Sequence, residues 1–140
     1  MTQEDKELLL RDLCGRLPYV VKIYDTKNSV NIPYMNLCHI NGIVNEVFIS
    51  SIMLCRAAPI EDIKPYLFPL SSMTKKQKEE YEDALVYHNY VAGGWTIAKT
   101  FNDEYIIPYW FVDFCNKNHF DYRGLIGKGL AIDATGLNIY

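Results

Sequence analysis

The chain has 140 residues and a formal net charge of −3, with 49% hydrophobic and 22% charged residues. This length is typical of one globular domain with its own core. The weak negative charge gives no overall electrostatic reason to expect binding to nucleic acid or to an anionic membrane. The unusual feature is the aromatic content, with eleven tyrosines. Tyrosine joins apolar area to a polar tip, so such chains are typical of half-buried sheet faces or of binding surfaces.

The cysteines and the N-terminal segment indicate a reducing compartment. The four cysteines lie among apolar neighbours and form no C-x-x-C pair, as buried reduced thiols do; they are Cys14, Cys38, Cys55 and Cys115. The polar N-terminal segment lacks the hydrophobic stretch of a signal peptide. No apolar run reaches the roughly 18 residues of a membrane-spanning helix. These features predict a cytoplasmic protein with no membrane partner.

A first helix is predicted from the start of the chain. Thr2 can cap it, and Asp5 three residues later makes a capping box. Gly15 followed by Pro18 ends the helix. The apolar stripe that faces the core is expected to be Leu9, Leu10 and Leu13, whereas Lys6, Glu7, Arg11 and Asp12 are expected in solvent.

A strand over residues 19–24 and a hairpin follow. Tyr19, Val21 and Ile23 are expected on one face of the strand. The dipeptide Asn41-Gly42 lies between two apolar-rich runs, 35–40 and 43–54, and suits a two-residue type I′ turn. That turn predicts the register Ile40 opposite Ile43, His39 opposite Val44, and Cys38 opposite Asn45.

The middle of the chain alternates between proline-rich and helical segments. Residues 60–70 carry or adjoin three prolines, which predicts an edge strand or an extended crossing. Thr74 and Gln77 form a second capping box that opens a helix to about His88. Gly93-Gly94 is expected to break this helix, and residues 95–101 to form a strand before a turn at Asn102-Asp103.

A third helix is predicted over residues 107–118, with Pro108 in its first turn. Its apolar stripe, Trp110, Phe111, Phe114 and Cys115, favours a central core helix. Asp121 is expected to cap a short turn over 122–128 that Gly129 ends, and residues 130–132 to form a closing strand. We therefore predict one α+β domain over residues 1–140, a curved antiparallel sheet of four to five strands with three main helices.

Three sequence blocks carry a resemblance. They are residues 8–19 (LLLRDLCGRLPY), residues 70–74 (LSSMT), and residues 119–126 (HFDYRGLI) followed by 128–131 (KGLA). In their order and spacing they resemble a family of short uncharacterised proteins found in gut-bacterial genomes and their mobile elements, including prophages. The resemblance implies no activity, but it implies a mobile-element association. Relatives tend to carry an acidic residue or proline at the position of Gly127, which disfavours any motif that depends on this glycine.

The densest cluster of reactive groups lies in the last of these blocks. It comprises His119, Asp121, Tyr122, Arg123 and Lys128. A carboxylate two residues from an imidazole can orient it, and a guanidinium can hold an anion, so a small enzyme could place its site here. The alternative is structural. Asp121 would then cap the turn, Arg123 would pair with Asp121 or helix-end carbonyls, and His119 would lie at the negative end of the third helix. In that reading Gly124 allows close packing, while Phe120 and Leu125 anchor the segment.

Other site chemistries fit the sequence poorly. Gly124-Leu125-Ile126-Gly127 has the spacing of a KH-type loop, but its two middle residues are bulky and apolar. No phosphate-binding loop and no G-x-S-x-G nucleophile elbow occurs. The histidines, His39, His88 and His119, have no zinc-ligand spacing. We predict neither a metal nor a cofactor and name no catalytic residue, which leaves enzyme activity unassigned and less favoured than binding.

The remaining hypothesis is a protein-interaction module. Tyr87, Tyr90 and Trp95 are candidates for an exposed aromatic surface around Gly93-Gly94, and aromatic residues are enriched at interface hot spots. We therefore predict a small non-enzymatic binding or accessory protein, with a protein partner or self-association. The alternatives are a nucleic-acid-binding regulator that uses a Tyr-rich sheet face, and a small enzyme around His119, Asp121 and Arg123. The nucleic-acid alternative needs a basic face made of Lys22, Lys99, Lys117, Arg123 and Lys128.

Overall fold

The computed structural model describes residues 1–27, 35–41, 46–50, 55–91 and 108–140. The helices are α1 (Gln3–Arg16), α2 (Lys75–Val91) and α3 (Tyr109–Lys117), with short 3-10 turns at Leu17–Tyr19, Ile60–Asp62 and Leu70–Ser72. The strands are β1 (Lys22–Asp25), β2 (Met35–Asn41), β3 (Glu46–Ser50), β4 (Cys55–Pro59), β5 (Ile63–Pro69), β6 (Phe120–Asp121) and β7 (Ile132–Asp133). The predicted α+β class, with three main helices, is confirmed.

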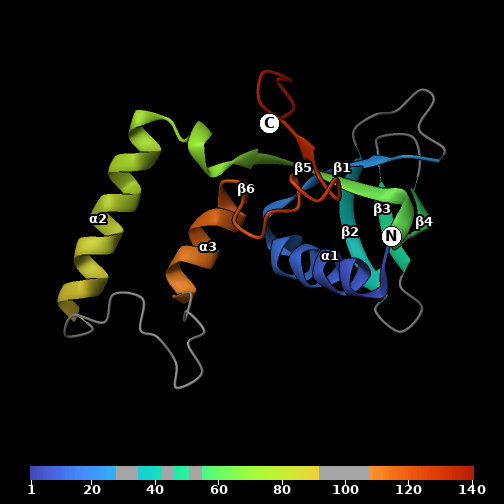
Figure 1. The fold of residues 1–140 in the computed structure, drawn as a ribbon, viewed down its shortest axis with the longest axis horizontal. Helices are drawn as coiled ribbons and strands as arrows, with labels where there is room; N and C mark the ends of the chain where they lie inside the picture. The colour runs from blue at the N-terminus through green and yellow to red at the C-terminus, as the bar shows by residue number, and fades with distance from the viewer. Residues whose placement is uncertain (28–34, 42–45, 51–54, 92–107) are drawn as a thin grey trace.

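The sheet follows the order β4-β3-β2-β1-β5-β6, and β7 also pairs with β5 (Figure 1). The five strands β1 to β5 pair antiparallel, as predicted. The two-residue strands β6 and β7 instead run parallel to β5, so the sheet is mixed. The sheet is also not strongly curved, so the prediction of a curved sheet is wrong. The parallel additions bring the C-terminal segment onto the centre of the molecule.

Helix α1 covers the sheet and begins as its sequence predicts. Asp5 N–H donates to the Thr2 hydroxyl, and the Asp5 carboxylate accepts from Thr2 N–H, so the capping box is confirmed. One prediction for this helix is wrong, because Asp12 is fully buried with Arg16 and does not face solvent. These two residues share the inward stripe of Leu9 and Leu13, which are also fully buried.

The first strand starts later than predicted. Tyr19 lies in the 3-10 turn, and Val20 takes a left-handed φ of 50°, so β1 begins only at Lys22. Val21 and Ile23 point into the core as expected and are fully buried. The Tyr19 hydroxyl instead donates a hydrogen bond to Asp113 of α3, and this bond raises the pKa of Tyr19.

The hairpin exists, but its predicted register is wrong. Ile40 pairs with Val47 and Asn41 with Glu46, so the strands do not meet at a two-residue Asn-Gly turn. A register shift between Leu37 and His39 further offsets the two strands. The extra residue of such a bulge changes which side chains oppose one another, and sequence patterning alone does not reveal it. Residues 42–45 lie outside the described part of the chain.

Strand β5 is central rather than an edge, in contrast to its prediction. It pairs with β1 through Ile23 opposite Pro65, and with β6 and β7 further along. At the next position of the register the backbone groups of Lys22 and Tyr66 turn toward each other, since both bond the hydroxyl of Tyr140. Because such pairs alternate in an antiparallel ladder, Ile23 and Pro65 form a non-hydrogen-bonded pair. Pro65 therefore interrupts no bond with β1.

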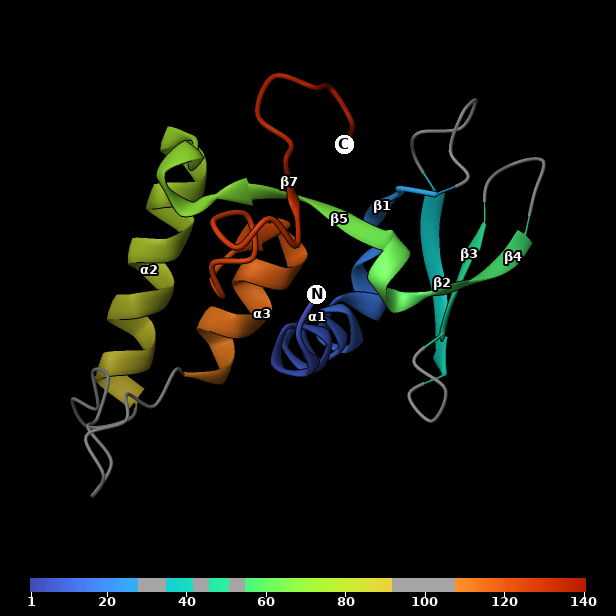
Figure 2. The ribbon, with the colours of Figure 1, turned by 45° about the vertical axis from the view of Figure 1, so that its right-hand side comes forward.

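Helices α2 and α3 lie side by side at the far end from the β2–β4 strands (Figures 1 and 2). The Thr74 and Gln77 capping box is confirmed, and α2 continues to Val91, slightly beyond the predicted end. Tyr81 packs on three rings of α3, those of Trp110, Phe111 and Phe114, with centroids 5.7, 6.0 and 5.9 Å away.

The main core lies between α1 and the sheet, so the prediction that α3 is the central core helix is wrong. Pro108 is the N-cap of α3 rather than part of its first turn, and Phe114, Cys115 and Phe120 form a second, smaller cluster. The predicted break at Gly93-Gly94, the strand over 95–101 and the turn at Asn102-Asp103 lie outside the described residues. Where the chain is described, no helix is long and apolar enough to cross a membrane.

We predict that Leu67→Ala lowers the free energy of unfolding by about 2–5 kcal/mol, because Leu67 is fully buried in β5 and its loss leaves a cavity. Leu70→Ala is the matched control, since Leu70 is 37% exposed and its loss should cost under about 1 kcal/mol. Chemical denaturation of both variants measures the difference. Equal losses of unfolding free energy in the two variants would mean that Leu67 does not belong to the core.

Candidate functional site

The C-terminal segment docks along one side of α1. Among the described residues, three polar contacts between residues 119–128 and α1 follow the helix from end to end. Lys128 Nζ lies 3.9 Å from Asp5 Oδ1, and Arg123 Nε lies 3.4 Å from Asp12 Oδ1. At the end of the helix, Arg16 Nη2 donates to the Phe120 carbonyl oxygen at 2.8 Å. The segment that the sequence singled out is therefore fastened to the first helix.

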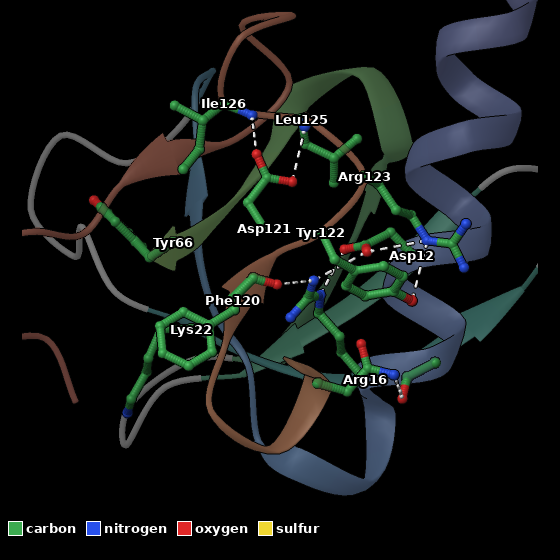
Figure 3. Close-up of polar contacts among 12 residues, drawn as sticks. Asp12, Arg16, Lys22, Tyr66, Phe120, Asp121, Tyr122, Arg123, Leu125 and Ile126 are labelled. Atoms are coloured by element: carbon green, nitrogen blue, oxygen red, sulfur yellow. Dashed lines mark hydrogen bonds and ion pairs between the residues drawn. The ribbon is translucent and has the colours of Figure 1, made fainter. Parts of the chain in front are cut away.

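Two of these contacts involve a buried ion pair within α1, formed by Asp12 and Arg16. Arg16 Nε donates to Asp12 Oδ2 at 2.6 Å, and Arg16 Nη2 donates to Asp12 Oδ1 at 3.1 Å, a bidentate geometry (Figure 3). Both side chains are fully buried. Within the described residues, Arg16 Nη1 is buried without a hydrogen-bond partner. A fork of two charge-assisted bonds is the geometry that best offsets the cost of burying a guanidinium and a carboxylate.

Tyr122 lies between two guanidinium groups. The Cζ atoms of Arg123 and Arg16 lie 4.8 and 5.7 Å from the centroid of its ring, within cation–π range. Arg123 is also half-buried, and it pairs with Asp12. The prediction that Arg123 pairs with Asp121 or with helix-end carbonyls is therefore wrong. Two cations share one carboxylate here, so the cluster carries a local excess of positive charge.

Asp121 caps the turn that follows it, as predicted. Its Oδ1 accepts from Leu125 N–H at 2.9 Å and its Oδ2 from Ile126 N–H at 2.8 Å (Figure 3). Leu125 and Phe120 are buried and anchor the segment. The expected packing role of Gly124 is wrong, because a Cβ there would meet nothing within 4 Å. Its φ of +73° is the reason for glycine, since few other residues adopt it readily.

Close packing requires a different glycine, Gly15. A Cβ on Gly15 would lie 3.1 Å from the amide nitrogen of Asn116, whose Nδ2 donates to the Gly15 carbonyl oxygen at 3.2 Å. This contact brings α3 against the end of α1. The end of α1 therefore meets α3 through Gly15 and β6 through the Phe120 carbonyl that Arg16 binds.

His119 follows α3 but is not held as a helix-end cation. Its ring stacks on Tyr140 with centroids 3.9 Å apart and planes 14° from parallel. Burial, with a smaller contribution from the charge of Arg16, lowers the pKa of His119 to about 4. Desolvation disfavours the imidazolium and outweighs the helix dipole, which would favour it. His119 is therefore neutral near pH 7.

These contacts leave little for catalysis. Both oxygens of Asp121 accept backbone hydrogen bonds, and Asp12 is held by two arginines. Burial raises the pKa of the Cys115 thiol to about 12, so this cysteine is a poor nucleophile. In the described ranges no group of three or more His, Cys, Asp or Glu side chains is placed to hold a metal ion. The cluster links elements of the fold and presents no nucleophile beside a base.

Two residues of this site, Asp12 and Arg16, were missed by sequence reasoning although a signal was present. They are four residues apart, the spacing of a helical ion pair. They also continue the spacing of Leu9 and Leu13 on the same stripe. Opposite charges that interrupt an apolar stripe at helical spacing indicate a buried pair, and the segment 119–123 supplies the groups that complete it.

The aromatic surface is shown only in part. Tyr87 is 63% exposed on α2, while the side chain of Tyr90 and the whole of Trp95 lie outside the described structure. Val86, 69% exposed, and Tyr109, 83% exposed, are additional large apolar side chains on this helix pair. Tyr109 was not predicted. Its signal is its position directly after the Pro108 N-cap, ahead of the inward residues Trp110 and Phe111.

Comparison with known proteins gives no functional guidance. No protein-family model matches the chain, and neither a curated protein nor a solved structure is significantly similar to it.

We predict that Asp121→Ala lowers the free energy of unfolding by about 1–3 kcal/mol, because two backbone N–H groups lose their acceptor. Asp133→Ala is the matched control, as Asp133 is exposed and accepts a single N–H from Thr135 at 2.8 Å. Thermal and chemical denaturation should show the smaller loss for Asp133→Ala. A larger loss for the control would mean that Asp121 does not hold the segment.

Proposed function

We propose that the protein is a small non-catalytic binding protein whose partner is another protein. The observation that carries this proposal is the contrast between two sets of side chains. The chemically capable groups of residues 119–128 are engaged in contacts within the fold, whereas large apolar side chains on α2 and α3 face solvent. Exposed aromatic side chains are the type that contributes most to protein interfaces.

The proposed contact region is the end of the α2–α3 pair. We call Val86, Tyr87 and Tyr109 the distal apolar group. Val86 and Tyr87 belong to the last turns of α2, and Tyr109 is the first residue of α3. Figures 1 and 2 show these helix ends together at one extremity of the molecule, away from the sheet. Two helices that present apolar residues at one end offer a surface for another helix or loop.

A nucleic-acid-binding role is less well supported. Of the five basic residues that such a role needs on one face, three are close to carboxylates. Lys117 Nζ lies 3.5 Å from Glu80, Lys128 Nζ lies 3.9 Å from Asp5, and Arg123 contacts Asp12. Each contact reduces the positive charge available to phosphates. The resemblance to mobile-element proteins would fit a small accessory factor, and this association is part of the proposal.

We predict that Tyr87→Ser/Tyr109→Ser removes a specific protein partner in affinity copurification from native cells, because truncating a central aromatic contact typically costs about 2 kcal/mol or more of binding free energy. The double variant should melt within a few degrees of wild type, since both rings are exposed. Mass spectrometry identifies the partner, and the 260/280 nm absorbance ratio reports nucleic acid.

The control is Lys75→Ser/Lys76→Ser, at the opposite end of α2, where both residues are exposed. This variant should retain the partner. Retention by both variants would remove the distal apolar group as the contact region. Recovery of nucleic acid in place of a protein would favour the regulator hypothesis and contradict the proposal.

A further inference from the structure

Tyr140 connects β1 and β5 at the point where their direct pairing stops. Lys22 and Tyr66 are the next positions after Ile23 and Pro65 in the register. Lys22 N–H donates to the Tyr140 hydroxyl at 2.9 Å, and this hydroxyl donates to the Tyr66 carbonyl oxygen at 2.9 Å. One side-chain hydroxyl thus satisfies a backbone donor and a backbone acceptor. Tyr140 stands where a direct bond between the strands would otherwise form.

The ring of Tyr140 also covers His119. The two rings stack 3.9 Å apart, and the Phe68 ring lies 5.8 Å from Tyr140. His119 holds a left-handed φ of 57°, which is uncommon outside glycine, asparagine and aspartate. Its Nδ1 is buried and, within the described residues, has no hydrogen-bond partner. Protonation of the imidazole would place a positive charge beneath the Tyr140 ring, with an Nδ1–H that lacks an acceptor.

The residues that lead to Tyr140 are exposed. We call residues 135–140 the strap. It starts beyond Ala134, whose N–H donates to the Leu67 carbonyl oxygen at 2.8 Å, and residues 135–138 all face solvent. Gly136 and Asn138 take φ values of +77° and +50°, which turn the chain back toward the sheet. The strap is therefore held on both sides. Ala134, which precedes it, bonds the backbone of β5, and Tyr140, its last residue, is held by its hydroxyl and by the stack on His119.

We propose that the strap is released by acid: protonation of His119 expels the Tyr140 ring and frees the backbone groups of Lys22 and Tyr66. The proposal does not depend on the proposed function. In the docked state the imidazole is covered and close to Arg16, whereas in the released state it reaches water. The released state therefore binds the proton more tightly, and acid shifts the equilibrium toward it.

The pH range follows from the two states of His119. Its pKa is about 4 when docked, because of burial and the charge of Arg16, and close to the ordinary value of roughly 6.5 once exposed. A folded pKa below the free value makes docking weaker as the pH falls from about 6.5 to 4. The released fraction should then rise about tenfold per pH unit. Above about pH 6.5 the protonation of His119 no longer affects docking.

The other groups around His119 do not change charge in this range. Arg16 from α1 is a cation that opposes a further positive charge on the imidazole. Cys115 of α3, with a pKa of about 12, stays a thiol, and burial raises the pKa of Tyr140, so its hydroxyl remains a donor. The neighbouring Asp121 turns both oxygens to backbone N–H groups. His119 is thus the group that can couple the strap to acidity.

The test is hydrogen exchange at the Lys22 amide, which Tyr140 protects. After correction for intrinsic rates, its protection should fall about thirtyfold between pH 7.5 and pH 5. The Leu37 amide is the internal control, because it donates to the Val21 carbonyl oxygen on the opposite edge of β1 and should keep its protection. Parallel loss at Leu37 would mean general unfolding and would overturn the proposal.

Two variants separate the pH-sensitive role of His119 from the hydrogen bonds that the Tyr140 hydroxyl makes to Lys22 and Tyr66. His119→Asn tolerates the left-handed backbone and has no charge to gain, so protection of Lys22 should become independent of pH. Tyr140→Phe keeps the ring but removes the hydroxyl, so Lys22 should exchange quickly at every pH. An unchanged pH response in His119→Asn would contradict the role of His119. Full protection of Lys22 in Tyr140→Phe would contradict the role of the hydroxyl.

Discussion

The buried pair of Asp12 and Arg16 is the interaction on which the arrangement of this fold depends. Burying a guanidinium and a carboxylate costs several kcal/mol, which only good geometry offsets. Within α1 the pair supplies two short bonds, and Arg16 needs a further acceptor, which the Phe120 carbonyl provides. The segment after α3 therefore has to return to α1. Its return sets β6 against β5 and gives Asp12 a second cation, Arg123.

This use of charged groups decides where function can lie. The histidine, carboxylates and arginines that could have served a reaction are instead shared among α1, β6 and the turn after it. The carboxylates and arginines are held by fixed partners within the fold, and His119 is covered by Tyr140. The parts of the molecule that remain as candidates for function are the distal apolar group of α2 and α3, at the surface, and the strap. In the strap a single side chain, that of Tyr140, links two strands of the sheet.

Sequence reasoning succeeded where the signal is local. The capping boxes at Thr2 and Thr74 and the cap at Asp121 depend on residues within five positions of each other, so their spacing alone predicts them. It failed where the partner is distant. The central place of β5 requires β6 and β7, which come more than fifty residues later in the chain. The hairpin places Ile40 opposite Val47, which is not the register of the two-residue turn that Asn41-Gly42 favours. Asp12 was predicted to face solvent because its charge was considered without Arg16, the partner four residues later in the helix.

A double-mutant cycle on the buried pair tests the central claim most directly. Arg16→Met alone should lower the free energy of unfolding by about 3–5 kcal/mol, because it leaves a buried carboxylate short of its fork and the Phe120 carbonyl without a donor. Asp12→Leu extends the stripe of Leu9 and Leu13, and the double variant should cost clearly less than the sum of the two single changes. Additive single effects, each under about 1 kcal/mol, would contradict the account, because two surface side chains would behave in that way.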